Sequence, residues 1–169
     1  GQHQKNIKLA KLLTFSEASV GIHIFGADVK NIKVENCICE YILGHGIQDN
    51  SEISFNEYIN NKASFNSQNG INANGNYLKV IGNYGRENGF GLLEAGCGNG
   101  IITHNVAEYN INAGISVGGY NAEDTNGHGN NNIVAHNTCS NNLQKGLNIT
   151  IGVVDSIISN NICYKNGQI

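Results

Sequence analysis

The sequence predicts an all-β fold, a parallel β-solenoid, and three observations support that prediction. Asn and Gly, which favour tight turns because they tolerate left-handed backbone angles, number 30 and 22 among the 169 residues. Hydrophobic residues make up 40% of the chain and are spread in short Ile, Val and Leu groups rather than in long helical runs. The third observation is an internal repeat of about 22 residues.

The repeat is clearest in two stretches that align without a gap, starting at Asn61 and Asn105. Each has a second Asn five residues after the first, and a Gly-Ile pair nine and ten residues after it. Similar frames recur along the chain, and their first Asn residues are Asn36, Asn61, Asn83, Asn105, Asn137 and Asn161. The intervals are 25, 22, 22, 32 and 24 residues, which indicates a coil of nearly constant length with one insertion.

Strands are expected wherever a short apolar group lies between Asn or Gly residues, as at 32–34, 101–102, 133–134 and 157–158. Around each Gly-Ile site, side chains alternate between the interior and the surface. The expected outward residues are His23, Gln48, Asn72, Asn74, Ser116 and Asn148. Residues 8–19 are expected to form a strand or a short helical cap. We predict one domain over residues 1–169, with six to seven coils, as a mature or excised part of a longer chain.

This frame resembles the right-handed parallel β-helix superfamily, the pectate-lyase-like group with short β-helix repeats. The resemblance covers roughly residues 31–166, with residues 21–24 as an earlier coil, and rests on the repeat alone. It implies a right-handed coil and a ladder of stacked side-chain amides at the six first-Asn positions. Family members of known activity are mostly polysaccharide lyases, glycoside hydrolases, epimerases and phage tail-spike proteins. The resemblance therefore implies a polysaccharide partner and a secreted or cell-surface location.

The composition of the chain argues against nucleic acid and against a membrane span. A net charge of −3 and a pI near 6.0 argue against nucleic-acid binding, which favours a basic surface. No apolar run approaches the length of a membrane span, and the first residues show no signal-peptide pattern. The ends of a solenoid expose sheet edges, so we expect either caps or self-association through uncapped ends.

The longest interval contains an inserted loop, residues 119–130, directly after an expected strand. Loops on a rigid β scaffold are common places for binding groups. Glu123 and Asp124 are candidate calcium ligands, because Ca²⁺ prefers oxygen donors. Tyr120 is a candidate platform for stacking a sugar ring. The alternative is a solvated polar loop without a ligand.

Two cationic residues are candidate catalytic bases, because the resemblance implies a lyase that removes a proton beside a carboxyl group. Arg86, the sole arginine, follows Asn83 and lies beside Glu87. An arginine is a poor base, since its pKa lies above about 12. The alternative for Arg86 is a surface ion pair with Glu87 or Glu108. Lys145 precedes the strand at Gly146 and is better placed; its alternative is a solvated lysine.

Asp49 and Glu94 each occupy the third position after a Gly, where other coils have apolar residues. The two coils between them imply a gap of about 10 Å. One interpretation is an inverting glycosidase pair, whose carboxyl groups stand about 6.5–9.5 Å apart. The other is a pair of strand-end acids that face solvent.

Two pairs of residues are expected to stack in adjacent coils. His104 and His136 precede ladder Asn residues and lie on an outer face, where a metal pair and simple exposure are both open. Cys139 and Cys163 share a column of small residues, where buried thiols and a disulfide are both open.

The leading functional hypothesis is a carbohydrate-active protein, leaning towards a polysaccharide lyase or a glycoside hydrolase. Its substrate would lie along the outward residues of the Gly-Ile strands, of which Asn72, Asn74, Ser116 and Asn148 are the substrate-binding candidates. The alternative hypothesis is a non-catalytic structural or adhesive rod, such as part of a surface protein or a tail-spike.

Overall fold

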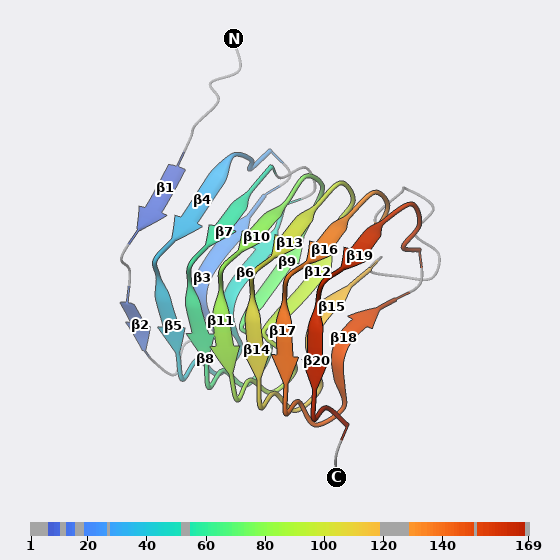
Figure 1. Cartoon of the computed structure of the whole chain (residues 1–169). Coiled ribbons are helices and arrows are strands. Elements are labelled where there is room, and N and C mark those ends of the chain that lie inside the picture. Colours follow the sequence, from blue (N-terminus) through green and yellow to red (C-terminus); the bar gives the residue numbers. More distant parts are fainter. Residues whose placement is uncertain are drawn as a thin grey trace.

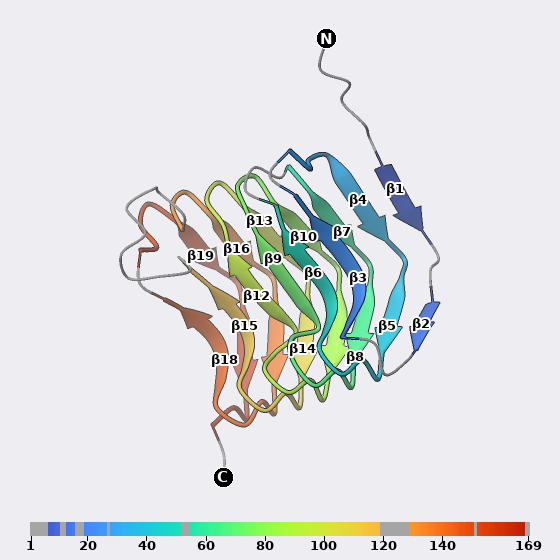
Figure 2. The same ribbon diagram turned by 180° about the vertical axis from the view of Figure 1, so that it is seen from behind.

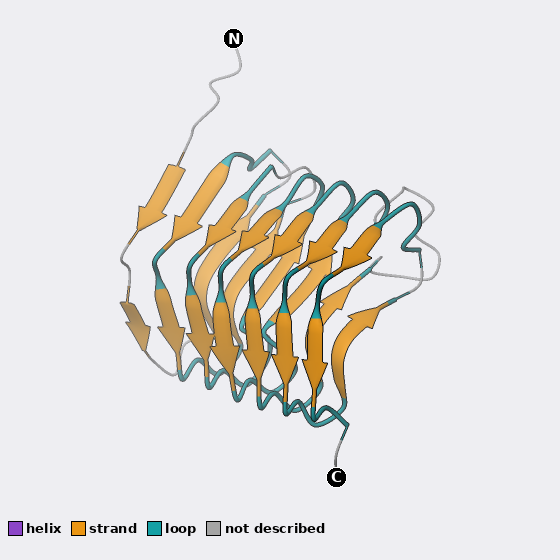
Figure 3. Ribbon diagram, viewed as in Figure 1, coloured by secondary structure: helices purple, strands orange, loops and turns teal. Residues whose placement is uncertain are grey.

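The computed structural model describes residues 7–10, 13–15, 19–26, 28–51, 55–118, 129–150 and 152–167. All regular structure in these residues is β-strand, and every strand pairing is parallel (Figure 3). The strands form three sheets, here named A, B and C, that wind round a common core (Figures 1 and 2). The all-β parallel solenoid predicted from the sequence is therefore confirmed.

Each coil contributes one strand to each sheet in turn. Sheet A contains β1 (Ile7–Ala10), β4 (Ile32–Glu35), β7 (Glu57–Ile59), β10 (Lys79–Ile81), β13 (Ile101–Thr103), β16 (Ile133–Ala135) and β19 (Ile157–Ser159). Sheet B contains β2 (Leu13–Phe15), β5 (Ile38–Glu40), β8 (Lys62–Ser64), β11 (Tyr84–Arg86), β14 (Val106–Glu108), β17 (Thr138–Ser140) and β20 (Ile162–Tyr164). Sheet C contains β3 (Val20–Phe25), β6 (His45–Asn50), β9 (Ile71–Asn74), β12 (Leu93–Gly96), β15 (Ala113–Val117) and β18 (Lys145–Ile149).

The core consists of columns of inward side chains, because parallel strands in exact register place like positions above one another. One sheet A column, buried completely, contains Val34, Tyr58, Val80, Ile102 and Val134. In sheet B the inward column is made of small residues: Cys39, Ala63, Gly85, Ala107 and Cys139. The predicted register of Cys139 with Cys163 is confirmed.

A ladder of Asn side chains joins the coils between sheets A and B. The Asn83 backbone N–H and side-chain amide both donate to Oδ1 of Asn105, at 2.9 and 3.0 Å, and Asn105 repeats this with Asn137 at 3.0 and 3.0 Å. The second amide hydrogen of each Asn satisfies a carbonyl of the preceding coil, as Asn105 does with Val80. A buried amide therefore satisfies turn groups of two coils at once.

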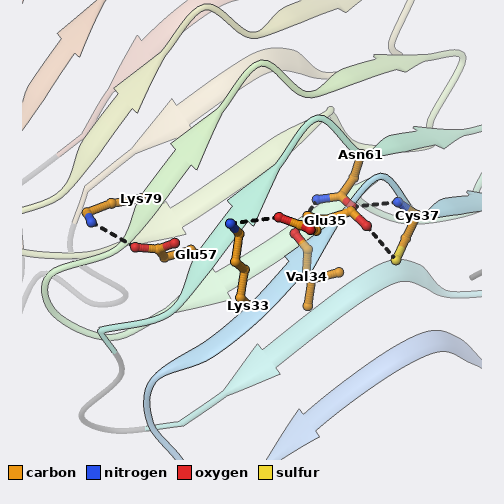
Figure 4. Close-up of polar contacts among 7 residues, drawn as sticks. All are labelled: Lys33, Val34, Glu35, Cys37, Glu57, Asn61 and Lys79. Atoms are coloured by element: carbon orange, nitrogen blue, oxygen red, sulfur yellow. Dashed lines mark hydrogen bonds and ion pairs between the residues drawn. The ribbon is translucent and has the colours of Figure 1, made fainter. Parts of the chain in front are cut away.

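The prediction that Asn36 is the first member of this ladder is wrong. Its place belongs to Cys37, whose backbone N–H donates to Oδ1 of Asn61 at 2.9 Å (Figure 4). Asn36 instead takes the left-handed conformation, with a φ of 52°, as the residue before the ladder position does in the later coils. Among those residues are His104 and His136, whose rings stack with centroids 5.1 Å apart, as their shared register predicts.

Two further ladders lie at the other corners of the coil. Between sheets B and C, the side chains of Asn66, Asn88, Asn110, Asn142 and Asn166 repeat the same bonds. Before sheet A the third ladder is partial: Asn56 and Asn132 occupy it, and Ser156 accepts from the Asn132 N–H at 3.0 Å. Each coil thus has three turns, one at each ladder. The five residues from the first Asn to the second Asn of a repeat correspond to one strand and its turn.

The ladder sets a repeat close to that expected. Successive ladder positions from Cys37 to Asn161 are 24, 22, 22, 32 and 24 residues apart. The solenoid therefore makes about five turns with a repeat of about 24 residues, slightly fewer and longer than predicted. At the start of the chain, β1 and β2 show that strands, one of the two expected alternatives, occupy residues 7–10 and 13–15. No helix long and apolar enough to cross a membrane occurs in the part of the chain that the structure describes.

Replacing Asn105 by Ala should lower the free energy of unfolding by about 1–3 kcal/mol, because the buried turn groups of Asn83 and Val80 lose their partners. Urea denaturation followed by circular dichroism measures this difference. Asn148→Ala, on the outer face of sheet C, is the matched control and should change stability by about 0.5 kcal/mol or less. Equal stability of the two variants would contradict the role given to the ladder.

Candidate functional site

The outer face of sheet C carries a column of hydrogen-bonding side chains. Strand register aligns Gln48 with Asn72, Asn72 with the Glu94 position, and that position with Ser116 and then Asn148. The shared register of His23, Gln48, Asn72, Ser116 and Asn148 is therefore confirmed, whereas Asn74 aligns with Gly96 instead. Because adjacent parallel strands lie about 4.8 Å apart, polar groups recur at that spacing along the rod.

Three of the predicted site residues meet at the β18 end of this face. Lys145 Nζ donates to Oδ1 of Asn148 at 3.1 Å, and Asn148 Nδ2 donates to Oγ of Ser116 at 3.3 Å. Lys145 is exposed, so its ammonium group remains accessible from solvent. The arrangement fixes an amide and a hydroxyl beside one cation, which suits a hydroxylated ligand with or without an acidic group.

A second cluster lies on β6 and β9. Asn74 Nδ2 donates to Oδ1 of Asn72 at 3.4 Å, and Asn72 Nδ2 lies 3.5 Å from Nε2 of His45. Asn72 is only 8% exposed although it belongs to the outward column. Oδ1 of Asn74 is buried and has no hydrogen-bond partner in the described part of the chain. This face therefore contains one acceptor with unused capacity beside a constrained amide pair.

The expected pairing of Glu94 with Asp49 in one column is wrong. Strand register places Glu94 opposite Asn72 and Ser116, whereas Asp49 lies opposite Ile24 and Ala73. Assigning strand positions by counting residues after Gly91 therefore shifts every residue of this coil by one position. The Leu92 N–H donates to the carbonyl of Gly114, and the Leu92 carbonyl accepts from the Ile71 N–H. Leu92 therefore takes the position that Gly holds in neighbouring coils.

Asp49 is an interior residue and not a solvent-facing acid, so that expectation is also wrong. Its side chain is completely buried and accepts four hydrogen bonds. Oδ1 accepts from the N–H and hydroxyl of Ser51 at 2.9 and 2.6 Å, and Oδ2 accepts from Asn56 Nδ2 at 2.8 Å and Tyr58 Oη at 2.5 Å. Burial, then the Asp49 charge, raises the pKa of Tyr58 well above its usual value, which keeps the hydroxyl protonated as a donor. This network holds a carboxylate inside the core and leaves it inaccessible to a substrate.

Arg86 forms the surface ion pair with Glu87 that was the alternative to a catalytic role. The hydrogen bond to Glu87 is the main reason that the pKa of Arg86 is raised. The guanidinium carbon lies 5.9 Å from the ring centroid of Phe65 and 5.3 Å from that of Tyr109. Both rings therefore lie within cation–π range of the guanidinium, which further favours its protonated form. Arg86 lies on sheet B, away from the polar column of sheet C.

The candidates in the inserted loop, Tyr120, Glu123 and Asp124, lie outside the described residues. The calcium site predicted there stays a prediction. Within the described residues, no group of three or more His, Cys, Asp or Glu side chains is close enough together to hold a metal ion.

The sequence interpretation missed an aromatic feature at the turns. Tyr41 stacks on Phe65 with centroids 4.9 Å apart, and Phe55 stacks on Tyr77 at 4.6 Å. All four rings belong to residues with positive φ that directly precede a ladder position. The signal was available, because aromatic residues recur one position before the ladder in adjacent coils.

No disulfide joins any of the five cysteines. Cys37, Cys39, Cys97 and Cys139 are buried, and Cys163 is exposed. Burial raises the pKa of Cys97 to about 12. Burial, with a smaller effect of Cys163, raises the pKa of Cys139 to about 12. The buried thiols pack as small apolar groups. The expectation of buried thiols therefore holds for Cys139 and is wrong for Cys163, which is exposed.

Comparison with known proteins gives no family for this chain and one weak structural similarity. No family model and no curated protein matches the sequence. Among solved structures, the chain is similar to QnrB1, described as a plasmid-mediated fluoroquinolone resistance protein, with 12% sequence identity. The match covers 92% of this chain and 91% of that chain, with a TM-score of 0.24. The parallel strand pairings themselves define the solenoid fold of this chain.

Replacing Asp49 by Ala should destabilise the fold by about 2–3 kcal/mol, because the buried donors of Tyr58 and Asn56 lose their acceptor. Thermal or urea unfolding measures the change. Asp28→Ala removes an exposed carboxylate and should have an effect of about 0.5 kcal/mol or less. If Asp49→Ala unfolds like the native protein, the carboxylate does not anchor this part of the core.

Brief treatment of the folded protein with iodoacetamide at pH 8 should alkylate Cys163 alone. A pKa of about 12 leaves the Cys97 and Cys139 thiols almost entirely protonated, and the thiolate is the reactive form. Mass spectrometry of the intact protein counts the adducts, with Cys163→Ser as the control that should gain none. Rapid labelling of Cys139, or a Cys139–Cys163 disulfide in the isolated protein, would disprove this description of the thiols.

Proposed function

We propose that this protein is a pectate-lyase-like β-helix that binds a polysaccharide along the outer face of sheet C. The observation that carries the proposal is the in-register column of Gln48, Asn72, Ser116 and Asn148. These side chains offer both donors and acceptors, which neutral sugar hydroxyls require. A straight array that repeats every coil suits a chain of repeating units better than a small compact molecule.

The charge of this face supports a neutral or weakly acidic polysaccharide. Lys145 is the cation of the polar cluster, and a polyanion would need several such groups. In the proposal Lys145 contacts an acidic substituent or a hydroxyl, and it is the remaining candidate for a catalytic base. Glu123 and Asp124 keep their proposed role as calcium ligands, and Tyr120 keeps its proposed role in ring stacking. A polysaccharide ligand also agrees with a secreted or cell-surface location.

A second candidate function, a non-catalytic structural or adhesive rod, is supported by the amide ladders. Most ladder groups bond to one another in the interior, so they provide rigidity and no chemistry. Of the catalytic candidates, Asp49 is enclosed in the core and Arg86 is paired with Glu87. Binding without cleavage would favour the adhesive rod, and cleavage would favour the enzyme.

Affinity electrophoresis against a panel of neutral and acidic polysaccharides, with and without calcium, tests the proposal. The double variant Ser116→Ala/Asn148→Ala should bind the retained polysaccharide about 10-fold more weakly, since two hydrogen-bonding groups are lost. The matched control is Thr138→Ala/Ser140→Ala, which removes two outward hydroxyls from sheet B and should bind like the native protein. Equal weakening by both variants, or no retention by any polysaccharide, would refute binding along sheet C. Absorbance of unsaturated products tests for lyase activity in the same samples.

A further inference from the structure

The turns between sheets B and C carry exposed apolar side chains along the length of the solenoid. These turns follow β5, β8, β11, β14 and β17 and lie side by side along the lower edge of Figure 1. Backbone hydrogen bonds fix their register, as between the Phe65 N–H and the Arg86 carbonyl and between the Ile111 N–H and the Asn88 carbonyl. We name residues 41–43, 65–68, 86–90, 109–112 and 141–144 the corner ridge. Its exposed large apolar residues are Tyr41, Leu43, Phe90, Tyr109, Ile111 and Leu143.

Turn geometry does not explain these apolar residues. Turns favour Gly, Asn, Asp and Ser, yet Tyr41, Leu43 and Ile111 are 59%, 60% and 55% exposed. Tyr41 and Tyr109 have φ values of 59° and 57°, in a region that is unfavourable for a bulky side chain. Because adjacent coils lie about 4.8 Å apart, the side chains form a continuous strip rather than scattered contacts. A continuous exposed apolar strip is typical of an interaction surface.

The middle of the corner ridge carries one charge of each sign. Arg86 and Glu87 form an ion pair, and their side chains are still 38% and 44% exposed. Both charges are therefore accessible to a second molecule. Phe65 lies in the turn of the preceding coil and Tyr109 in that of the following coil, with ring centroids 5.9 and 5.3 Å from the guanidinium carbon. Along its length the ridge is apolar, then charged, then apolar again.

This order is the same when it is followed in either direction from the central turn. A two-fold axis at Arg86 and Glu87 would place the Phe65 turn of one copy against the Tyr109 turn of an antiparallel copy. The Leu43 turn would likewise meet the Leu143 turn. Arg86 of each copy would meet Glu87 of the other, which satisfies the self-complementarity that a symmetric dimer interface requires. A lipid surface or a polyion would match only one of the two central charges.

We propose that the corner ridge is the interface of an antiparallel homodimer whose two-fold axis passes through the turn at Arg86 and Glu87. Removal of the apolar strip from water drives association. The four central charges alternate in sign across the axis and fix the antiparallel orientation. The interface does not depend on polysaccharide binding, which concerns the outer face of sheet C.

Sedimentation velocity of the native protein over a wide range of concentration should show a reversible dimer. Ile111→Lys should weaken association about 10-fold or more, because it places a charge in the apolar strip. The matched control, Ile133→Lys, lies on the outer face of sheet A, is 39% exposed and should dimerise like the native protein. Circular dichroism confirms that both variants fold. A native protein that stays monomeric, including one that instead binds phosphatidylcholine vesicles through Ile111, would overturn the proposal, and so would equal effects of the two variants.

Exchange of the central charges tests the pairing across the axis. Arg86→Glu and Glu87→Arg should each dimerise about 10-fold more weakly, because like charges then meet at the axis. An equimolar mixture of these two variants should form heterodimers of nearly native strength, since opposite charges meet again. A mixture that associates no better than the separate variants would contradict the pairing.

Cross-linking tests the antiparallel orientation. In a Cys163→Ser background, a mixture of Leu43→Cys and Leu143→Cys should give a heterodimer with a short bismaleimide, because these turns meet across the axis. Leu43→Cys alone should give no cross-linked dimer. Efficient cross-linking of Leu43→Cys to itself, or none in the mixture, would overturn the antiparallel arrangement.

Discussion

The side-chain amide ladder is the interaction on which the rest of this structure depends. Each interior Asn accepts two N–H groups from the preceding coil and returns a donor to a carbonyl of that coil, as Asn105 does for Asn83 and Val80. Buried turn groups would otherwise lack partners, which is costly in a dry interior. The bond geometry leaves no freedom for one coil to slide past the next, so the ladder also fixes strand register.

The ladder requires an unfavourable backbone conformation in the residue that precedes each ladder position. The residue before each ladder position turns the chain into the left-handed region, and in some coils that residue is a Tyr or Phe rather than Gly or Asn. A bulky side chain in this region is unfavourable by roughly 1 kcal/mol or more. Tyr41 on Phe65 and Phe55 on Tyr77 offset part of that cost by ring stacking between coils. Register therefore brings strained residues together in pairs that stabilise one another.

Fixed register also gives the faces of the rod separate chemistry. Sheet A carries the ion pairs Lys33–Glu35 and Glu57–Lys79 near its start, both at 2.7 Å (Figure 4), and exposed isoleucines near its end. On sheet B, Arg86 lies near the rings of Phe65 and Tyr109, and sheet C bears the amide and hydroxyl column. The proposed polysaccharide face is thus a property of the outward columns of sheet C alone.

The sequence by itself determined the all-β solenoid, its near-constant repeat and most of its columns, including the outward strip and the pairs His104–His136 and Cys139–Cys163. Those features follow from which residue types recur, and recurrence is visible in one dimension. Tertiary structure alone placed Cys37 in the ladder instead of Asn36, put Glu94 in register with Asn72 and Ser116, and enclosed Asp49 in the core. The first two depend on hydrogen bonds to the following coil, and the third depends on the buried polar groups of Ser51, Asn56 and Tyr58. A hydrogen bond from the next coil defines a position even where the expected residue type is missing, and only the folded chain brings that neighbour within reach.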